Sequence, residues 1–147
     1  MIKIKIIRHA ERLDYTYPLY WIACIGQFMS DSPLTSNGHK TAQEKGKKMA
    51  LDNFNPKIIY TSPYKRTMQT STEIQKSFGK AQIITETLLA EYQPSSFHKI
   101  SLYPDGIPTT YDGKSLGLSY PESYENFTKR VKFIINGFSN YFTKMMT

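Results

Sequence analysis

A histidine between two arginines follows the first apolar stretch of the chain, where Arg8 and Arg12 bracket His9. A neutral imidazole can attack phosphorus through one ring nitrogen while the other donates a hydrogen bond, and a guanidinium binds phosphate oxygens through its planar fork of donors. These residue types therefore suit an enzyme that forms a phosphohistidine. An isolated Arg-His pair more often caps a strand and pairs with nearby carboxylates, so the remaining motifs decide between the two interpretations.

Two further candidate groups follow later apolar stretches. Arg66 comes after Ser62-Pro63 at the start of an expected helix, and free N–H groups with a partial positive charge make a helix N-terminus favourable for anions. Glu91 follows another apolar stretch, where a carboxyl group could act as a general acid or could be an ordinary surface glutamate. Sites in α/β proteins lie at strand ends, so we expect His9, Arg66 and Glu91 to lie near one another.

Three short apolar stretches predict the strands that would position these groups. Lysine and isoleucine alternate within residues 1–7, which predicts a partly buried strand that ends at Arg8. Residues 58–61 and 81–85 predict a second and a third strand.

Helical periodicity accounts for much of the remainder. Residues 36–51 predict a helix with lysines on one face and small or apolar side chains on the other, namely Ala42, Gly46, Met49 and Ala50. Thr35 is suited to its N-cap. A second helix is expected to follow the turn at residues 62–63 and to end at Gly79. A third, over residues 121–142, carries an apolar stripe.

Two stretches lack a clean period. Residues 13–32 are rich in aromatic side chains and predict either a loop that folds over a site or a small hydrophobic cluster beneath a long loop. Residues 93–120 are rich in Ser, Pro, Gly and Tyr and predict a long loop, which in compact domains is often a lid. His39 has no acidic partner nearby in the sequence, so we expect an ordinary surface histidine.

Length and charge limit the class of protein. A chain of 147 residues is expected to form a single domain over residues 1–147. Lys and Arg number 19 against 12 Asp and Glu, and the net charge of +7 favours anionic partners such as phosphate esters. The basic residues are spread along the chain and form no arginine-rich arm, so we expect no nucleic-acid partner. Lys45, Lys47 and Lys48 are interpreted as a solvated helix face.

Cysteine content and hydropathy bear on the compartment. Cys24 is the single cysteine, so no internal disulfide can form, and we expect a small core residue in a reducing compartment. Residues 1–7 are too short and too rich in lysine for a signal peptide, and no run of about 18 apolar residues could span a membrane. We therefore expect a cytoplasmic protein without a membrane partner.

The order Arg-His, Arg, Glu along the chain resembles the histidine phosphatase (phosphoglycerate mutase-like) superfamily. The resemblance extends over essentially the whole chain, and Ala10 stands where the family's Arg-His-Gly hallmark has glycine. Within the superfamily, the chain looks most like the Sts/UBASH3 group at residues 8–15, at the Leu-x-Glu-Tyr motif of residues 89–92 and at residues 109–111. The phosphatase domains of that group act on phosphotyrosine and other phosphomonoesters. The other matching positions are Pro33-Leu34-Thr35, Gly38, Ala42, Ser62-Pro63, Arg66, Thr70, Glu122-Ser123 and Arg130-Val131.

The resemblance implies a fold and a reaction. The fold would be a three-layer α/β/α domain with a mainly parallel central sheet. His9 would become phosphorylated, and Glu91 would protonate the leaving oxygen and then activate water. Arg8, Arg12 and Arg66 would bind the phosphoryl oxygens, without a metal or any other cofactor. The implied substrate is a phosphorylated small molecule or a phosphotyrosine-type group.

One part of the family pattern has no counterpart in the printed sequence. The family places a second histidine at the end of a strand that follows the last helix, and only His39 and His98 remain here, neither in that position. We therefore expect a domain lacking that strand, with weak turnover and possible self-association through an exposed edge of the strand at residues 1–7. The alternative function is a catalytically impaired phosphate-binding or interaction protein derived from the family.

Overall fold

A computed structural model describes residues 3–25, 31–92 and 121–144. The predicted loop over residues 93–120 lies outside the described residues. In chain order, the helices and strands are α1 (Leu13–Thr16), α2 (Pro18–Ile25), α3 (Ser36–Leu51), β1 (Ile58–Thr61), α4 (Lys65–Gln75), β2 (Gln82–Thr85), the 3₁₀ helix η2 (Thr87–Leu89) and α5 (Tyr124–Lys144).

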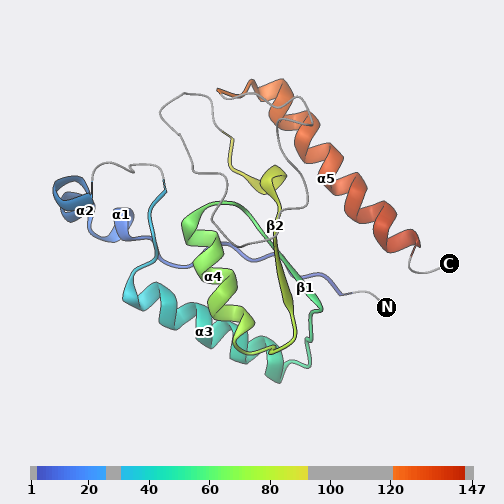
Figure 1. The fold of residues 1–147 in the computed structure, drawn as a ribbon, viewed down its shortest axis with the longest axis horizontal. Coiled ribbons are helices and arrows are strands. Elements are labelled where there is room, and N and C mark those ends of the chain that lie inside the picture. Colours follow the sequence, from blue (N-terminus) through green and yellow to red (C-terminus); the bar gives the residue numbers. More distant parts are fainter. Residues whose placement is uncertain (1–2, 26–30, 93–120, 145–147) are drawn as a thin grey trace.

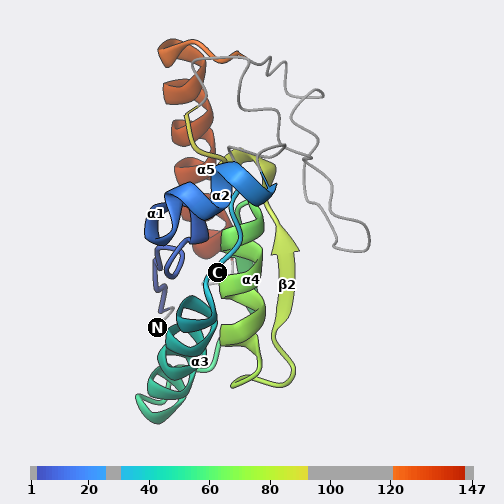
Figure 2. The ribbon, with the colours of Figure 1, turned by 90° about the vertical axis from the view of Figure 1, so that its left-hand side faces the viewer.

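The described sheet consists of β1 and β2, which pair in parallel with Ile58 opposite Gln82 and Thr61 opposite Thr85. The helix α4 forms the crossover between them. Figures 1 and 2 show α3 and α4 side by side next to the strands, and Figure 1 shows α5 on the opposite side of the sheet. The prediction of a mixed α/β fold with parallel strands is therefore confirmed. Both strands end on buried threonines, Thr61 and Thr85, from which the chain enters the α4 and η2 segments.

Residues 3–7 do not form the predicted strand. They carry no strand assignment, and the side chains of Ile4 and Ile6 are 60% and 98% exposed. Lys5 instead lies over the ring of Phe54, with its Nζ 4.8 Å from the ring centroid and 3.8 Å from an oxygen of Asp52. Residues with a high β propensity form a strand only when a neighbouring strand completes the hydrogen-bond ladder. No described strand pairs with residues 3–7.

The prediction of a loop across residues 13–32 is also wrong in its first half, where α1 and α2 occur. Pro18 occupies the first position of α2, where a fixed φ and a missing N–H are harmless. Trp21 is only 4% exposed and anchors this segment, while Tyr15, Tyr17 and Tyr20 remain exposed. Aromatic residues on several faces of two short helices leave no periodic stripe, which is why the pattern looked irregular. The side chain of Cys24 lies outside the described residues.

The apolar core lies between α3, α4 and the strands. Met49, Ile74, Phe78 and Ala81 form its buried cluster, against which Phe54 and Ile59 pack. Helical spacing predicted the burial of Ala42, Gly46 and Met49 on α3, and all three are buried. Ala50, grouped with them in the prediction, is exposed, as are the three lysines on the opposite face.

Two helix ends differ from the sequence prediction. The helix α4 ends at Gln75, and turns lead to Gly79, whose positive φ of 47° fits its predicted role as a stop. The last helix begins at Tyr124 rather than at Pro121, because the hydroxyl of Ser123 accepts the backbone N–H of Asn126 at 3.1 Å and so caps it. Among the described residues, no helix combines the length and apolarity needed to cross a membrane.

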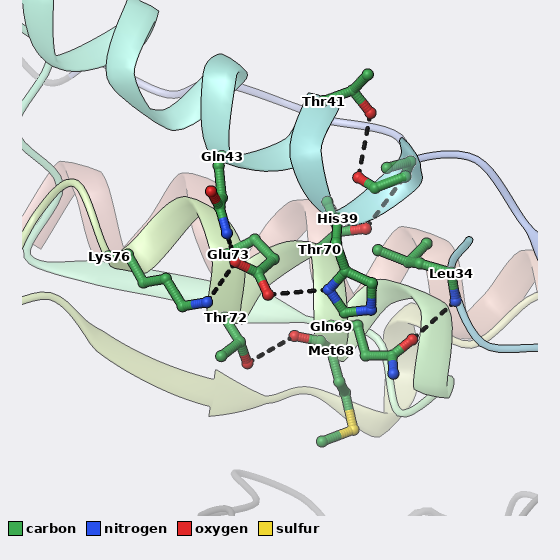
Figure 3. Close-up of polar contacts among 12 residues, drawn as sticks. Leu34, His39, Thr41, Gln43, Met68, Gln69, Thr70, Thr72, Glu73 and Lys76 are labelled. Carbon is green, nitrogen blue, oxygen red and sulfur yellow. Dashed lines mark hydrogen bonds and ion pairs between the residues drawn. The ribbon is translucent and has the colours of Figure 1, made fainter. Parts of the chain in front are cut away.

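A carboxylate on α4 ties α3 to α4. Figure 3 shows His39 and Gln43 of α3 pointing toward Glu73. The His39 Nδ1 lies 2.9 Å from one oxygen of Glu73, and Gln43 donates to the other at 2.7 Å, where Lys76 also binds. His39 is therefore a partly buried member of a helix–helix contact rather than an ordinary surface histidine. The sequence could not show this because its acidic partner lies 34 residues away.

Replacing Glu73 with Gln should lower the free energy of unfolding by about 1 kcal/mol at pH 7, since an ion pair and charged hydrogen bonds are lost. The hydrogen bond from Lys76, opposed by burial and reinforced by Gln43 and His39, lowers the pKa of Glu73 from 4.5 to about 2. A depressed carboxyl pKa stabilises the folded state above the unfolded-state value and loses that effect as the pH falls toward the folded-state value. The difference between parent and variant should therefore shrink between pH 4.5 and pH 2.

Urea unfolding of both proteins at several pH values measures this difference. Glu44→Gln, which changes an exposed glutamate on α3, serves as the matched control and should have little effect. A destabilisation by Glu73→Gln that stays constant down to pH 2 would contradict the prediction.

Candidate active site

His9 is held by its own backbone and by α4. The N–H of Ala10 donates to the Thr70 hydroxyl at 3.0 Å, and that hydroxyl donates to the Arg66 carbonyl at 2.8 Å. The Nδ1 of His9 lies 2.8 Å from the carbonyl oxygen of Ala10. A carbonyl only accepts hydrogen bonds, so Nδ1 carries the proton and the lone pair of the neutral ring lies on Nε2. This tautomer is the one a histidine nucleophile requires.

The surroundings of His9 favour its neutral form. Burial contributes most to lowering the pKa of His9, and the positive charges of Arg66, Arg12 and Arg8 lower it further, while the hydrogen bond to Ala10 acts in the opposite direction. The three predicted arginines are thus close enough to His9 to act on its protonation. Among the described residues Asn53 alone has a positive φ without being glycine, so alanine at position 10 carries no such strain.

Arg66 and Glu91 meet although they come from different elements. The Arg66 side chain is fully buried, its guanidinium lies 4.0 Å from the centroid of the Tyr64 ring, and its Nη2 is 2.6 Å from Glu91 Oε1. The Glu91 side chain remains 57% exposed. The structure therefore brings together the arginine at the start of α4 and the carboxylate that follows η2, with the carboxylate on the solvent side.

Arg12 is held in a fork with a neighbouring carboxylate. Its Nε and Nη2 donate to the two oxygens of Asp14 at 2.9 and 2.5 Å, and its guanidinium lies 4.1 Å from the centroid of the Tyr15 ring. Although burial alone would lower it, the pKa of Arg12 is raised by Asp14. Arg8 is exposed and adjoins His9 in the chain. Arg12 thus keeps its charge in a defined orientation.

Sequence inspection missed Asp31. Its Oδ1 accepts the backbone N–H of Lys65 at 2.7 Å, so a carboxylate from a distant segment binds the N-terminus of α4 that the motif predicts as an anion site. Burial raises the pKa of Asp31, against the opposing effects of the Lys65 backbone and the Arg66 charge. No local signal could have revealed it, because its partner lies 34 residues further along.

The segment carrying Arg12 is fixed against α3 by close backbone contact. Arg12 forms an isolated antiparallel bridge with Leu34, and the N–H of Thr35 donates to the Glu11 carbonyl at 3.0 Å. Thr35 also caps α3, as predicted, by accepting the N–H of Gly38 at 2.9 Å. A Cβ at Gly38 would lie 2.5 Å from the Glu11 carbonyl oxygen, so only glycine permits this approach.

Gly38→Ala should therefore destabilise the fold by about 1 to 3 kcal/mol through overpacking, and should displace the Glu11–Arg12 backbone. Gly137→Ala on α5 is the matched control, since nothing lies within 4 Å of a Cβ there and helix propensity should even improve stability slightly. Chemical unfolding of both variants measures the effect. Equal stabilities of Gly38→Ala and the parent would contradict this account of the contact.

The lowered pKa predicts how His9 titrates. His9 should gain its proton only below its ordinary value of 6.5 in the folded protein, because burial and the arginines oppose the charge. The unfolded chain then binds more protons than the folded chain just below that value, so this residue makes stability fall as the pH drops through the window. NMR titration of the His9 ring, assigned by His9→Gln, measures the midpoint. A midpoint at or above 6.5 would refute the expectation.

Within the described parts of the chain, no group of three His, Cys, Asp or Glu side chains gathers as a metal site would require. The groups that do converge are an imidazole, guanidiniums and one exposed carboxylate. Such a set can bind a tetrahedral oxyanion, offer a nitrogen nucleophile and supply an acid.

Residues 4–140, most of the sequence, match the histidine phosphatase superfamily (branch 1). The chain belongs to this superfamily. An uncharacterized phosphoglycerate mutase family protein of Acanthamoeba polyphaga mimivirus is 56% identical over 135 residues, a match that covers 92% of this chain and 66% of that protein. The ecdysteroid-phosphate phosphatase of Drosophila melanogaster is 28% identical, over 72% of this chain and 17% of that protein. The chain thus spans only part of the length of each relative.

A solved structure supports the same fold. The ecdysone phosphate phosphatase from Bombix mori in complex with tungstate matches with a TM-score of 0.65 and 22% sequence identity, over 93% of this chain and 66% of that chain. The likeness confirms the predicted α/β architecture of the superfamily. The likeness does not confirm the predicted assignment to the Sts/UBASH3 group within the superfamily.

Proposed function

We propose that this chain hydrolyses phosphomonoesters through a phosphohistidine on His9. The observation that carries the proposal is the hydrogen bond from His9 Nδ1 to the Ala10 carbonyl, which leaves Nε2 as the nucleophile beside three arginine charges. Membership of the histidine phosphatase superfamily supports it. The names of two phosphatases among the similar proteins support a phosphorylated substrate, either a small molecule or a phosphotyrosine-type group as in the Sts-type domains.

The proposed first step transfers the phosphoryl group to the protein. The lone pair of His9 Nε2 forms a bond to phosphorus as the bond from phosphorus to the ester oxygen breaks. Arg8, Arg12 and Arg66 bind the non-bridging oxygens, and Glu91 in its protonated form gives its proton to the leaving oxygen. An incoming phosphate would compete with Asp14 for Arg12 and with Glu91 for Arg66, the partners that these guanidiniums have in the structure.

The second step returns the protein to its starting state. Glu91, now a carboxylate, accepts a proton from water while the water oxygen bonds to phosphorus and the bond from phosphorus to Nε2 breaks. Inorganic phosphate leaves, and the His9 ring is again neutral. The exposure of the Glu91 side chain allows it to meet both the leaving group and water.

The test uses p-nitrophenyl phosphate and its ³²P-labelled form. Turnover with label trapped on the protein in an acid-labile, base-stable bond is expected for the parent and not for His9→Ala. Glu91→Gln should slow hydrolysis of β-glycerophosphate by about 100-fold or more and that of p-nitrophenyl phosphate far less, because only the poor leaving group needs a proton. Equal losses on both substrates would argue against the acid role of Glu91.

A folded parent that binds phosphate in calorimetry without turnover would overturn the hydrolase proposal in favour of the phosphate-binding alternative. An Arg8→Ala/Arg66→Ala variant should lose phosphate binding in either case. Lys47→Ala, which removes an exposed cation from α3, is the control for a non-specific effect of charge.

A further inference from the structure

Arg130 of α5 is almost completely buried together with Glu122, and both side chains are 1% exposed. The Nε of Arg130 donates to Glu122 Oε1 at 2.8 Å and its Nη2 donates to Oε2 at 2.6 Å. This two-pronged pair fixes the plane of the guanidinium. The pair also leaves three of the five N–H donors of Arg130 available for other acceptors.

Those donors all point at the segment that carries Glu91. Nη1 donates to the carbonyl oxygens of Leu88 at 2.6 Å and Ala90 at 2.7 Å, and Nη2 reaches the carbonyl of Glu91 itself at 3.5 Å. These carbonyls lie in or just after η2, where a 3₁₀ turn leaves its last acceptors without partners of its own. Every donor of Arg130 is thus used, and its acceptors outside Glu122 are backbone atoms that converge on Glu91.

The same stretch of backbone is held at both of its ends. Glu86 caps η2 by accepting the N–H of Leu88 at 3.0 Å. On the other side of Glu91, the ring of Tyr92 packs on α5, with ring centroids 5.3 Å from Phe127 and 5.9 Å from Tyr124. The Glu91 side chain, by contrast, is mostly exposed and has Arg66 as its ion-pair partner. Its position therefore depends on how firmly its backbone is fixed.

We infer that Arg130, oriented by Glu122, is a positioning residue that holds the Glu91 backbone so that the Glu91 carboxylate meets Arg66. The inference rests on the acid role proposed for Glu91. The described contacts of Arg130 include the backbone of Glu91 but neither His9 nor Arg66, so we expect its effect on the reaction to pass through Glu91. Losing it should impair the step that needs an acid more than the attack by His9.

Two variants separate this role from simple stabilisation. Arg130→Lys keeps the positive charge near Glu122, but a single ammonium cannot reach the carboxylate and three carbonyls together. Arg130→Met/Glu122→Met removes both charges, which avoids leaving a buried carboxylate unpaired. Lys129→Met/Glu125→Met is the matched control, because it removes an exposed ion pair of 2.7 Å from the same helix.

For the folded variants, kcat with p-nitrophenyl phosphate should stay within about threefold of the parent, while kcat with β-glycerophosphate should fall about 10-fold or more. In a Glu91→Gln background the Arg130 substitutions should cause no further loss on β-glycerophosphate, since the acid is already absent. The control pair should behave like the parent. Equal losses on both substrates, or an undiminished further loss in the Glu91→Gln background, would overturn the inference.

A second readout needs no turnover. The ¹³C signal of the Glu91 carboxyl, assigned by its loss in Glu91→Gln, should move toward that of the exposed Glu44 when Arg130 is changed to Lys, while the signals of Glu11 and Glu73 stay in place. An unmoved Glu91 signal in the folded variant would refute the positioning role. If the parent neither binds phosphate nor hydrolyses esters, the proposed function fails, and this signal still decides whether Arg130 positions Glu91.

Discussion

A stripe of polar side chains along one face of α4 binds several other segments of the described structure. Its members follow helical spacing, and each contacts a different segment of the chain. Arg66 meets Glu91, Gln69 accepts the N–H of Leu34 at 2.8 Å, Thr70 accepts the N–H of Ala10, and Glu73 binds His39 and Gln43. A buried polar group that loses its partner is costly, so each contact requires one defined position of the opposing segment. The stripe thereby sets where His9 lies relative to Arg66.

The buried arginines differ in how exposed their carboxylate partners are. Arg130 is buried with Glu122, and all its donors are bound within the protein. Arg66 is equally buried, but its carboxylate partner is largely exposed, and Arg12 is only partly buried in its pair with Asp14. The carboxylate of the Arg66 pair faces solvent and could give way to a phosphate oxygen, whereas the Arg130 pair is closed and holds backbone. Arg130 and Arg66 are the same residue type, and the exposure of their carboxylate partners distinguishes them.

The elements that the sequence predicted well are those whose signals are local. The helix α3 occurs over the predicted residues with the predicted cap at Thr35, because capping and apolar periodicity act within a few residues. The strand β1 matches its prediction and β2 begins one residue later than predicted, each being a short β-branched run after a turn. The sequence did not predict helices α1 and α2, because their aromatic residues form no apolar stripe and Trp21 is the only one of these aromatic residues that is buried.

By itself, the sequence determined the order of elements around the candidate site and the family. It also supplied the candidate side chains, which are Arg8, His9, Arg12, Arg66 and Glu91. The tertiary structure decided which of them meet, and added Asp31 at the start of α4, Glu73 beside His39 and Arg130 beside the Glu91 backbone. It also left residues 3–7 without a strand. The physical reason is the same in each case. Propensity and capping act over a few neighbouring residues, whereas ladder hydrogen bonds and buried ion pairs depend on partners that are distant in the sequence and adjacent only after folding.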